Sequence, residues 1–189
     1  MPASLDGLPA YDPRFLGAMH HELQRLISAL QEFYMRERAI LDRDLGERAL
    51  THRLAVQLER QFLGWEVDCD YNRLGDRTML LPRGTIVSTD DNLDKSIFPD
   101  IVVHQRAVPK NLLAIEVRKA SNHQPLAHDR HKLMAMTDPH LWFAYRVGLL
   151  LTLGRTGLTA SELYVGSQQD AALSAWFAGR LIDVGLHLP

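Results

Sequence analysis

Apolar residues between positions 14 and 42 recur every three or four residues, which is the spacing of one face of an α-helix. Charged residues stand between them, and Glu37 interrupts the apolar series once. The spacing predicts a long amphipathic helix over residues 14–42, after a proline-rich loose arm over 1–13. Its apolar stripe either packs on the core of its own chain, which we favour, or forms a coiled-coil seam between two copies in a homodimer.

A second helical pattern begins near residue 44 and ends near residue 62. Asp44 and Glu47 have the spacing of a capping box, with Asp44 as the N-cap and Glu47 at the third helical position. Glu47 lies three residues before Leu50, so it points to the apolar side of the helix.

The pattern then changes to that of strands. Alternation over residues 65–72 predicts one strand, and apolar runs over 100–106 and 111–118 predict two more. The short connection between the last two predicts an antiparallel hairpin. The remaining patterns predict a turn-rich stretch over 73–98 with a short strand at 78–81, a helix over 126–136, a short helix restarting at Asp138, a buried strand over 147–153, a short strand over 161–165 and a final helix over 170–181.

The predicted core order is helix, strand, strand, strand, helix, strand, which is an α/β arrangement with a mixed central sheet flanked by helices. We divide the chain into the arm and long helix, residues 1–43, and one globular α/β unit, residues 44–189. A chain of 189 residues with 46% hydrophobic positions has the size and composition of one soluble domain with a sizeable core.

Charge and cysteine content exclude several classes of function. The net charge is −2, so any contact with nucleic acid depends on a local patch. Cys69 is the only cysteine, which excludes an intramolecular disulfide and a cysteine-rich zinc site. The start of the chain does not read as a secretory signal, and no apolar stretch is long enough to span a bilayer. We therefore expect a cytoplasmic protein without a membrane partner.

Three acidic residues stand at the boundaries of the predicted elements. Asp100 follows Pro99 and opens a strand, Glu116 lies near the end of the next strand, and Glu47 lies near the start of a helix. Carboxylates on adjacent elements can converge on one divalent cation, and such a cation is a usual means of handling phosphate esters. Residues two apart share a strand face, so Glu116 and Arg118 point together while Lys119 points the other way.

Pro99-Asp100 followed by Glu116-Val117-Arg118-Lys119 resembles the motif of the PD-(D/E)XK nuclease superfamily, whose members have the restriction-endonuclease-like fold. The sequences of residues 47–55, 67–73 and 113–119 are similar to those of a bacterial branch of that superfamily, and the resemblance spans about residues 44–154. It implies a metal-dependent nuclease acting on nucleic acid, with DNA as the first expectation. Asp100 and Glu116 would be ligands of Mg²⁺ or Mn²⁺, and Glu47 would add a water-mediated contact.

The chain departs from the family at the motif lysine, which is Arg118 here. Arginine can hold a phosphate bidentately and stabilise developing charge, but it stays protonated and cannot act as a base. Lys119 could take the catalytic role if a β-bulge rotated it onto the active face, and Lys132 on the following helix is another candidate. The alternative function is a catalytically inactive relative that binds DNA or a protein partner, with the long helix as its interaction element.

Each acidic residue also has a purely structural explanation. Glu47 completes a capping box, and Asp100 can simply end a loop before a strand. Glu116 follows an apolar run, where a buried charge requires a partner, and a salt bridge to Arg118 or Arg106 would satisfy it without any metal.

A basic segment overlaps the carboxylate motif. Between residues 104 and 132 there are six Lys or Arg, four His and only two acidic residues. Such a segment beside a carboxylate site suits a nucleic-acid backbone, and a solvated helix face is the alternative. The residues we assign to nucleic-acid binding are Arg106, Lys119, Arg130 and Lys132.

Overall fold

The computed structural model describes residues 13–74, 77–79, 98–106 and 108–187. Its centre is a six-stranded sheet in the order β1-β4-β5-β6-β7-β8. β5 and β6 are parallel, and every other neighbouring pair in this sheet is antiparallel. The strands are β1 (Glu66–Cys69), β4 (Ile101–Gln105), β5 (Lys110–Lys119), β6 (Val147–Leu153), β7 (Leu158–Val165) and β8 (Gln168–Gln169), while β2 (Arg73–Leu74) and β3 (Arg77–Thr78) form a separate two-stranded ribbon.

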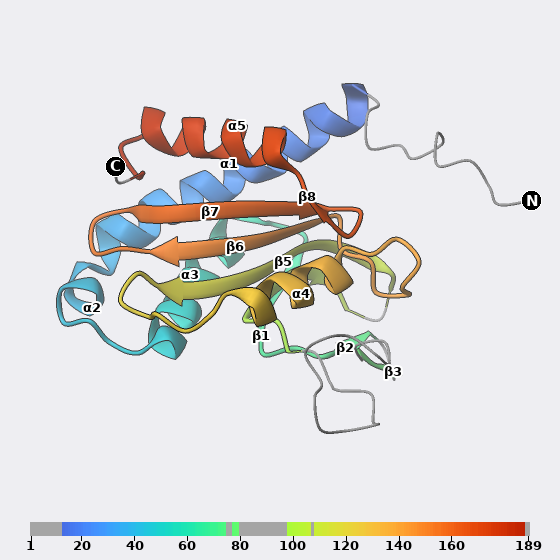
Figure 1. The fold of residues 1–189 in the computed structure, drawn as a ribbon, viewed down its shortest axis with the longest axis horizontal. Coiled ribbons are helices and arrows are strands. Elements are labelled where there is room, and N and C mark those ends of the chain that lie inside the picture. Colours follow the sequence, from blue (N-terminus) through green and yellow to red (C-terminus); the bar gives the residue numbers. More distant parts are fainter. Residues whose placement is uncertain (1–12, 75–76, 80–97, 107, 188–189) are drawn as a thin grey trace, which may run out of the picture.

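Helices cover both faces of the large sheet. Figure 1 shows α4 in front of the sheet, with α1 and α3 behind it. One cluster of buried apolar side chains joins the sheet to α1, α3 and α5, and a second joins it to α4. The helices are α1 (Pro13–Arg36), α2 (Arg38–Asp42), α3 (Glu47–Gln61), α4 (Ala127–Met136) and α5 (Ala171–Asp183). The expected mixed sheet with flanking helices and an added N-terminal helix is therefore present.

The predicted long N-terminal helix is divided into α1 and α2 at Glu37. Glu37 is buried, and its Oε1 accepts hydrogen bonds from Nε of Arg53 at 2.8 Å and from Gln57 at 3.4 Å. The break thus turns this carboxylate toward α3. The apolar stripe of α1 is buried in the core of its own chain, as we favoured; its buried members are Met19, Leu23, Leu26, Ile27, Leu30 and Phe33.

Two local predictions are wrong. The capping box does not form: Gly46 is the N-cap of α3, Glu47 is its first residue, and Asp44 has a left-handed backbone with φ 51°. No helix starts at Asp138, because the chain makes separate turns there and the backbone N–H of Tyr145 returns to bond the carbonyl of Met136 at 2.7 Å. Of the strand predicted at 78–81, Thr78 is the last residue of β3, and residues 80 and 81 lie outside the described residues.

The hairpin of β4 and β5 forms as predicted and contains one irregularity. Val103 pairs with Leu113 but His104 pairs with Asn111, so Leu112 is the extra residue of a β-bulge. Leu112 consequently joins the cluster beneath α1 and α3, whereas the alternation predicted it beside Glu116.

α4 crosses β6 at very short range over Gly148. A Cβ at Gly148 would lie 3.1 Å from Cγ2 of Thr137 and 3.2 Å from Cδ2 of Leu133. The glycine therefore allows α4 to approach the sheet closely.

In the described ranges, no helix combines the length and apolar character that crossing a membrane requires.

Candidate functional site

The three predicted carboxylates line one cavity. This cavity of about 400 Å³ lies where the end of β5 meets the start of α3 and α4. Asp100 precedes β4, Glu116 lies in β5 and Glu47 begins α3, so the fold brings together residues far apart in sequence. The other residues that line it are Val117, Arg118, Asn122, Gln124, Pro125, His128, Asp129 and Lys132.

Glu116 carries the most constrained carboxylate of the cavity. Its side chain is on the α4 face of β5 and the residue is only 2% exposed. Oε2 accepts a hydrogen bond from Nζ of Lys132 at 2.5 Å, while Oε1 is buried and has no hydrogen-bond partner among the described residues. Burial raises the pKa of Glu116 well above its ordinary value, and the charge of Asp100 adds to this against the opposing effect of Lys132.

Asp100 lies immediately before β4 and is tied to β5. Its Oδ2 accepts a hydrogen bond from the backbone N–H of Val117 at 2.7 Å. Burial raises the pKa of Asp100, and the Val117 hydrogen bond and the charge of Lys132 oppose that rise. The hydrogen bond fixes this carboxylate beside the strand position next to Glu116, and the charge of Asp100 contributes to the raised pKa of Glu116.

Lys132 is the cation that faces these carboxylates. It stands on α4, and its Nζ donates to Oε2 of Glu116 and, at 3.3 Å, to the carbonyl of Phe98. The sequence offered Lys132 as a nucleic-acid contact or as a substitute for the motif lysine, and only the crossing of α4 over β6 brings it to Glu116. The salt bridge to Arg118 or Arg106, which was the structural alternative for Glu116, does not form, because Arg118 pairs with Asp129 and Arg106 with Asp68.

Arg118 shares the face of Glu116, as the alternation predicted, but its guanidinium turns toward the loop between β5 and α4. It donates to Oδ2 of Asp129 at 2.8 Å, to the carbonyl of Gln124 at 3.0 Å and to the carbonyl of Pro125 at 3.3 Å. The Arg118 and Asp129 side chains are 8% and 15% exposed. Arg118 therefore anchors the wall of the cavity from within.

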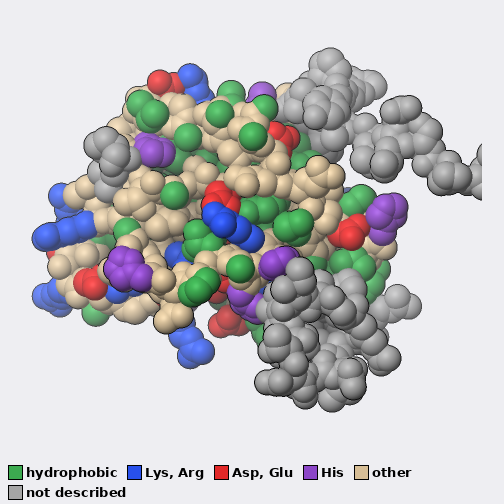
Figure 2. Space-filling model, in the orientation of Figure 1, with side chains coloured by type: hydrophobic (Ala, Val, Ile, Leu, Met, Phe, Trp, Pro, Cys, Tyr) green, Lys and Arg blue, Asp and Glu red, His purple; other side chains and the backbone are tan. Residues whose placement is uncertain are grey.

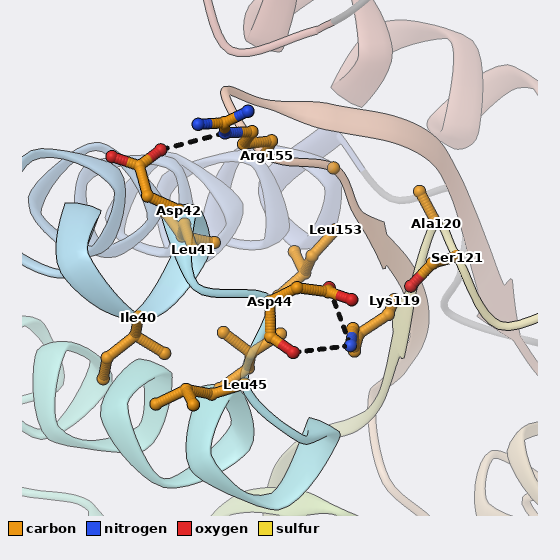
Figure 3. A pocket seen from close by; sticks show the side chains of 12 residues that line it. Ile40, Leu41, Asp42, Asp44, Leu45, Lys119, Ala120, Ser121, Leu153 and Arg155 are labelled. Atoms are coloured by element: carbon orange, nitrogen blue, oxygen red, sulfur yellow. Dashed lines mark hydrogen bonds and ion pairs between the residues drawn. The ribbon is translucent and has the colours of Figure 1, made fainter.

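Lys119 points away from the carboxylates. β5 pairs with β6 without a register shift from Leu113 to Lys119, so no bulge rotates this lysine onto the other face. Its Nζ contacts Oδ1 of Asp44 at 2.7 Å and the Asp44 carbonyl at 3.1 Å. Figure 3 shows both contacts at the side of a separate pocket of about 310 Å³. Lys119 therefore does not take the place of the motif lysine beside the carboxylates in this structure.

Glu47 holds the end of β5 in place. Its Oε1 accepts hydrogen bonds from the backbone N–H of Lys119 at 3.0 Å and from Nδ2 of Asn122 at 2.8 Å. These bonds join the start of α3 to the turn after β5. No sequence pattern indicates this role for Asn122, since its contact with Glu47 spans 75 residues of chain.

The basic segment predicted from the sequence separates in space. Arg106 stands at the opposite end of β4 from Asp100 and pairs with Asp68 through an Nε–Oδ2 distance of 2.8 Å. Arg130 pairs with Glu162 at 2.7 Å. In Figure 2, Lys and Arg side chains stand mainly at the left of the view, over α2 and the adjoining end of the sheet, and are sparse across the face that carries α4. The four cations that we assigned to nucleic-acid binding are each paired with an acidic residue, and they do not form the expected patch.

The donor set suits a magnesium-like ion bound by few protein ligands. Within the described part of the chain, no group of three or more His, Cys, Asp and Glu side chains is placed to hold one ion. Mg²⁺ is nevertheless commonly bound through one or two carboxylates, with waters and substrate phosphate completing its shell. Asp100 and Glu116 supply that pair, and Oε1 of Glu116 is a buried oxygen without a hydrogen-bond partner among the described residues. The residues therefore fit such an ion.

A scan against protein-family models, a search of curated proteins and a search of solved structures each found no match.

Proposed function

We propose that this protein is a divalent-metal-dependent nuclease of the PD-(D/E)XK superfamily, with the restriction-endonuclease-like fold, that hydrolyses phosphodiester bonds of nucleic acid, first of all DNA. The observation that supports it most is the pair Asp100 and Glu116 in one cavity beside Lys132, with one buried oxygen of Glu116 that has no partner among the described residues. The order α3, β1, β4, β5, α4, β6 agrees with the order that the resemblance implies.

The energetics of Glu116 favour a functional role over a structural one. A buried carboxylate destabilises a fold unless it is well paired, and apolar residues of similar volume usually stabilise at least as well as a buried ion pair. Here one oxygen of Glu116 has no hydrogen-bond partner in the described part of the chain, and the charge of Asp100 acts on the same carboxylate. Strained electrostatics of this kind are concentrated at functional sites.

Each residue then has a defined role. Asp100 and Glu116 hold the cation, which when bound would neutralise phosphate charge and lower the pKa of a coordinated water. Lys132 orients the Glu116 carboxylate and supplies positive charge at the phosphate, and as a lysine it can also give up a proton, which Arg118 cannot. Glu47 and Arg118 position the segment between β5 and α4.

The second candidate is a catalytically inactive relative that binds DNA or a protein. The identity of Arg118 at the place of the motif lysine favours it, since Arg118 is engaged by Asp129 and two carbonyls. Such a protein would bind a divalent cation or DNA without cleaving any substrate.

The test is incubation of the purified protein with supercoiled DNA, linear DNA, single-stranded DNA and RNA in Mg²⁺ or Mn²⁺. We expect cleavage that Asp100→Asn abolishes. Lys132→Met should slow it by about 10²- to 10⁴-fold, the usual contribution of a positioned acid or base. Lys119→Met distinguishes the two lysines, because its side chain lies on the other face. Loss of cleavage in Lys119→Met alone would assign the role to Lys119, and no cleavage of any substrate by the folded protein would favour the inactive relative.

A further inference from the structure

The carboxylate cavity adjoins a second cavity on the other side of Asp100. This second cavity, of about 430 Å³, shares Glu47 and Asp100 with the first as a common wall. Both volumes lie in the lower part of the range of small-molecule sites, so each is suited to a nucleotide-sized group. The remaining residues of the second cavity come from α3 and the end of β1: Arg48, Thr51, His52, Cys69 and Asp70.

Arg48 and His52 form the cationic wall of the second cavity. They are four residues apart on α3, so they share one helix face, and both are exposed. Arg48 forms no ion pair with any residue of the described ranges, whereas Arg118 and Lys132 in the first cavity are paired with Asp129 and Glu116. Arg48 therefore has its charge available to a ligand.

Acidic groups face Arg48 and His52 across the second cavity. Asp70 is exposed at the end of β1, and Asp100 and Glu47 form the shared wall. Glu47 is occupied by Lys119 N–H and Asn122, and Asp100 by Val117 N–H. An anion entering this cavity is thus drawn toward Arg48 and His52, and repelled by Asp70 and by the carboxylates of the shared wall.

We propose that a DNA strand crosses Asp100 from one cavity to the other, and that Arg48 and His52 hold the backbone phosphate next to the scissile one. The proposal rests on the nuclease function given above. An arginine can bind a phosphate through two parallel hydrogen bonds, and a histidine can add another. A strand that extends to both sides of Asp100 and Glu116 presents an internal phosphodiester to them, so the expected mode of cleavage is endonucleolytic.

The subsite is tested first by binding, independently of catalysis. Fluorescence anisotropy of a labelled single-stranded DNA oligonucleotide is measured without divalent metal over a series of salt concentrations. Arg48→Ala should weaken binding several-fold and lower the slope of log K against log salt by about 1, as expected for one phosphate contact. His52→Ala should weaken binding less, and Asp70→Asn should tighten it.

Arg180→Ala is the matched control, because Arg180 is a half-exposed arginine on α5 that lines neither cavity and pairs with Asp183. It should bind DNA as the wild type does. Identical affinity and salt dependence in Arg48→Ala and Arg180→Ala would overturn the subsite.

The path of the strand is tested on closed circular single-stranded DNA, which has no ends. Cleavage of the circle supports passage through both cavities, and digestion of linear DNA alone overturns it. If the wild type cleaves no substrate, the nuclease proposal fails by itself, and the anisotropy of Arg48→Ala alone decides whether the second cavity binds a phosphate.

Discussion

The buried pair of Glu116 and Lys132 gives the most quantitative prediction for the fold around the site. The Glu116 and Lys132 side chains are 3% and 12% exposed, and their charged atoms are 2.5 Å apart. Lys132→Met keeps the apolar stem and removes the cation, which leaves Glu116 buried without a hydrogen bond to either oxygen. Breaking a buried pair in this way costs about 3–5 kcal/mol. The open cavity and the partial exposure of Lys132 place the expected loss near the lower value, about 3 kcal/mol.

The loss in Lys132→Met depends on pH and on the partner. Glu116 takes up a proton as the pH falls, because its pKa is raised by burial. The loss should therefore be smaller at pH 6 than at pH 8. The double variant Glu116→Leu with Lys132→Met removes both charges, and an apolar pair in place of a buried ion pair is often neutral or stabilising. We expect it to be within about 1 kcal/mol of the wild type, far from the sum of the single changes.

Equilibrium unfolding in guanidinium chloride, with the midpoint and slope determined at both pH values, measures these differences. The reasoning is refuted if Lys132→Met costs less than about 1 kcal/mol at pH 8, since the ion pair would then not be buried as described. It is refuted equally if the double variant is as unstable as the sum of the two single variants.

Three further predictions concern the packing, the pH dependence and the loop of the site. Gly148→Ala should lose about 1–2 kcal/mol of unfolding free energy because its Cβ would meet Thr137 and Leu133 of the α4 segment. Gly179→Ala on α5, where a Cβ meets nothing within 4 Å, should gain about 0.5–1 kcal/mol. Thermal unfolding compares the two variants, and a Gly148→Ala protein as stable as the wild type would contradict the close approach of α4. The pKa of Glu116 is raised above its ordinary value of 4.5 in the folded state. Without divalent metal, the stability of the wild type relative to Glu116→Gln should therefore fall as the pH rises from 4.5 through the folded-state pKa. Denaturation at several pH values measures this difference, and a difference that rises with pH would contradict the prediction. Arg118→Lys should cost about 1–2 kcal/mol because one ammonium cannot keep all three acceptors, and a faster cleavage rate in this variant would show that position 118 retains the motif role.

Local periodicity predicted those parts of the fold that depend on local sequence. The 3.6-residue pattern gave the helices, and the two-residue alternation placed Glu116 and Arg118 on one face and Lys119 on the other. The short link between β4 and β5 predicted their antiparallel pairing, which forms. The carboxylates at positions 100 and 116 line a common cavity, because the hairpin aligns the start of β4 with the end of β5.

Contacts between distant elements could not be predicted in the same way. The sequence pattern does not predict how closely α4 packs on the sheet at Gly148. This close packing brings Lys132 into contact with Glu116. The capping box at Asp44 failed because Asp44 adopts a left-handed backbone and pairs with Lys119 on a strand 75 residues away. Likewise, a run of basic residues along the chain does not predict a patch, since acidic partners such as Asp68 come from other strands.

Binding of Mn²⁺ to the metal-free protein tests the metal-binding pair most directly, and the electron paramagnetic resonance signal of free Mn²⁺ measures it during titration. We expect saturable binding at a site that Asp100→Asn and Glu116→Gln each remove, while Arg180→Ala leaves it intact. Wild-type protein that binds no Mn²⁺ at millimolar concentration, or Asp100→Asn protein that binds it as the wild type does, would contradict the assignment of Asp100 and Glu116 as the metal-binding pair.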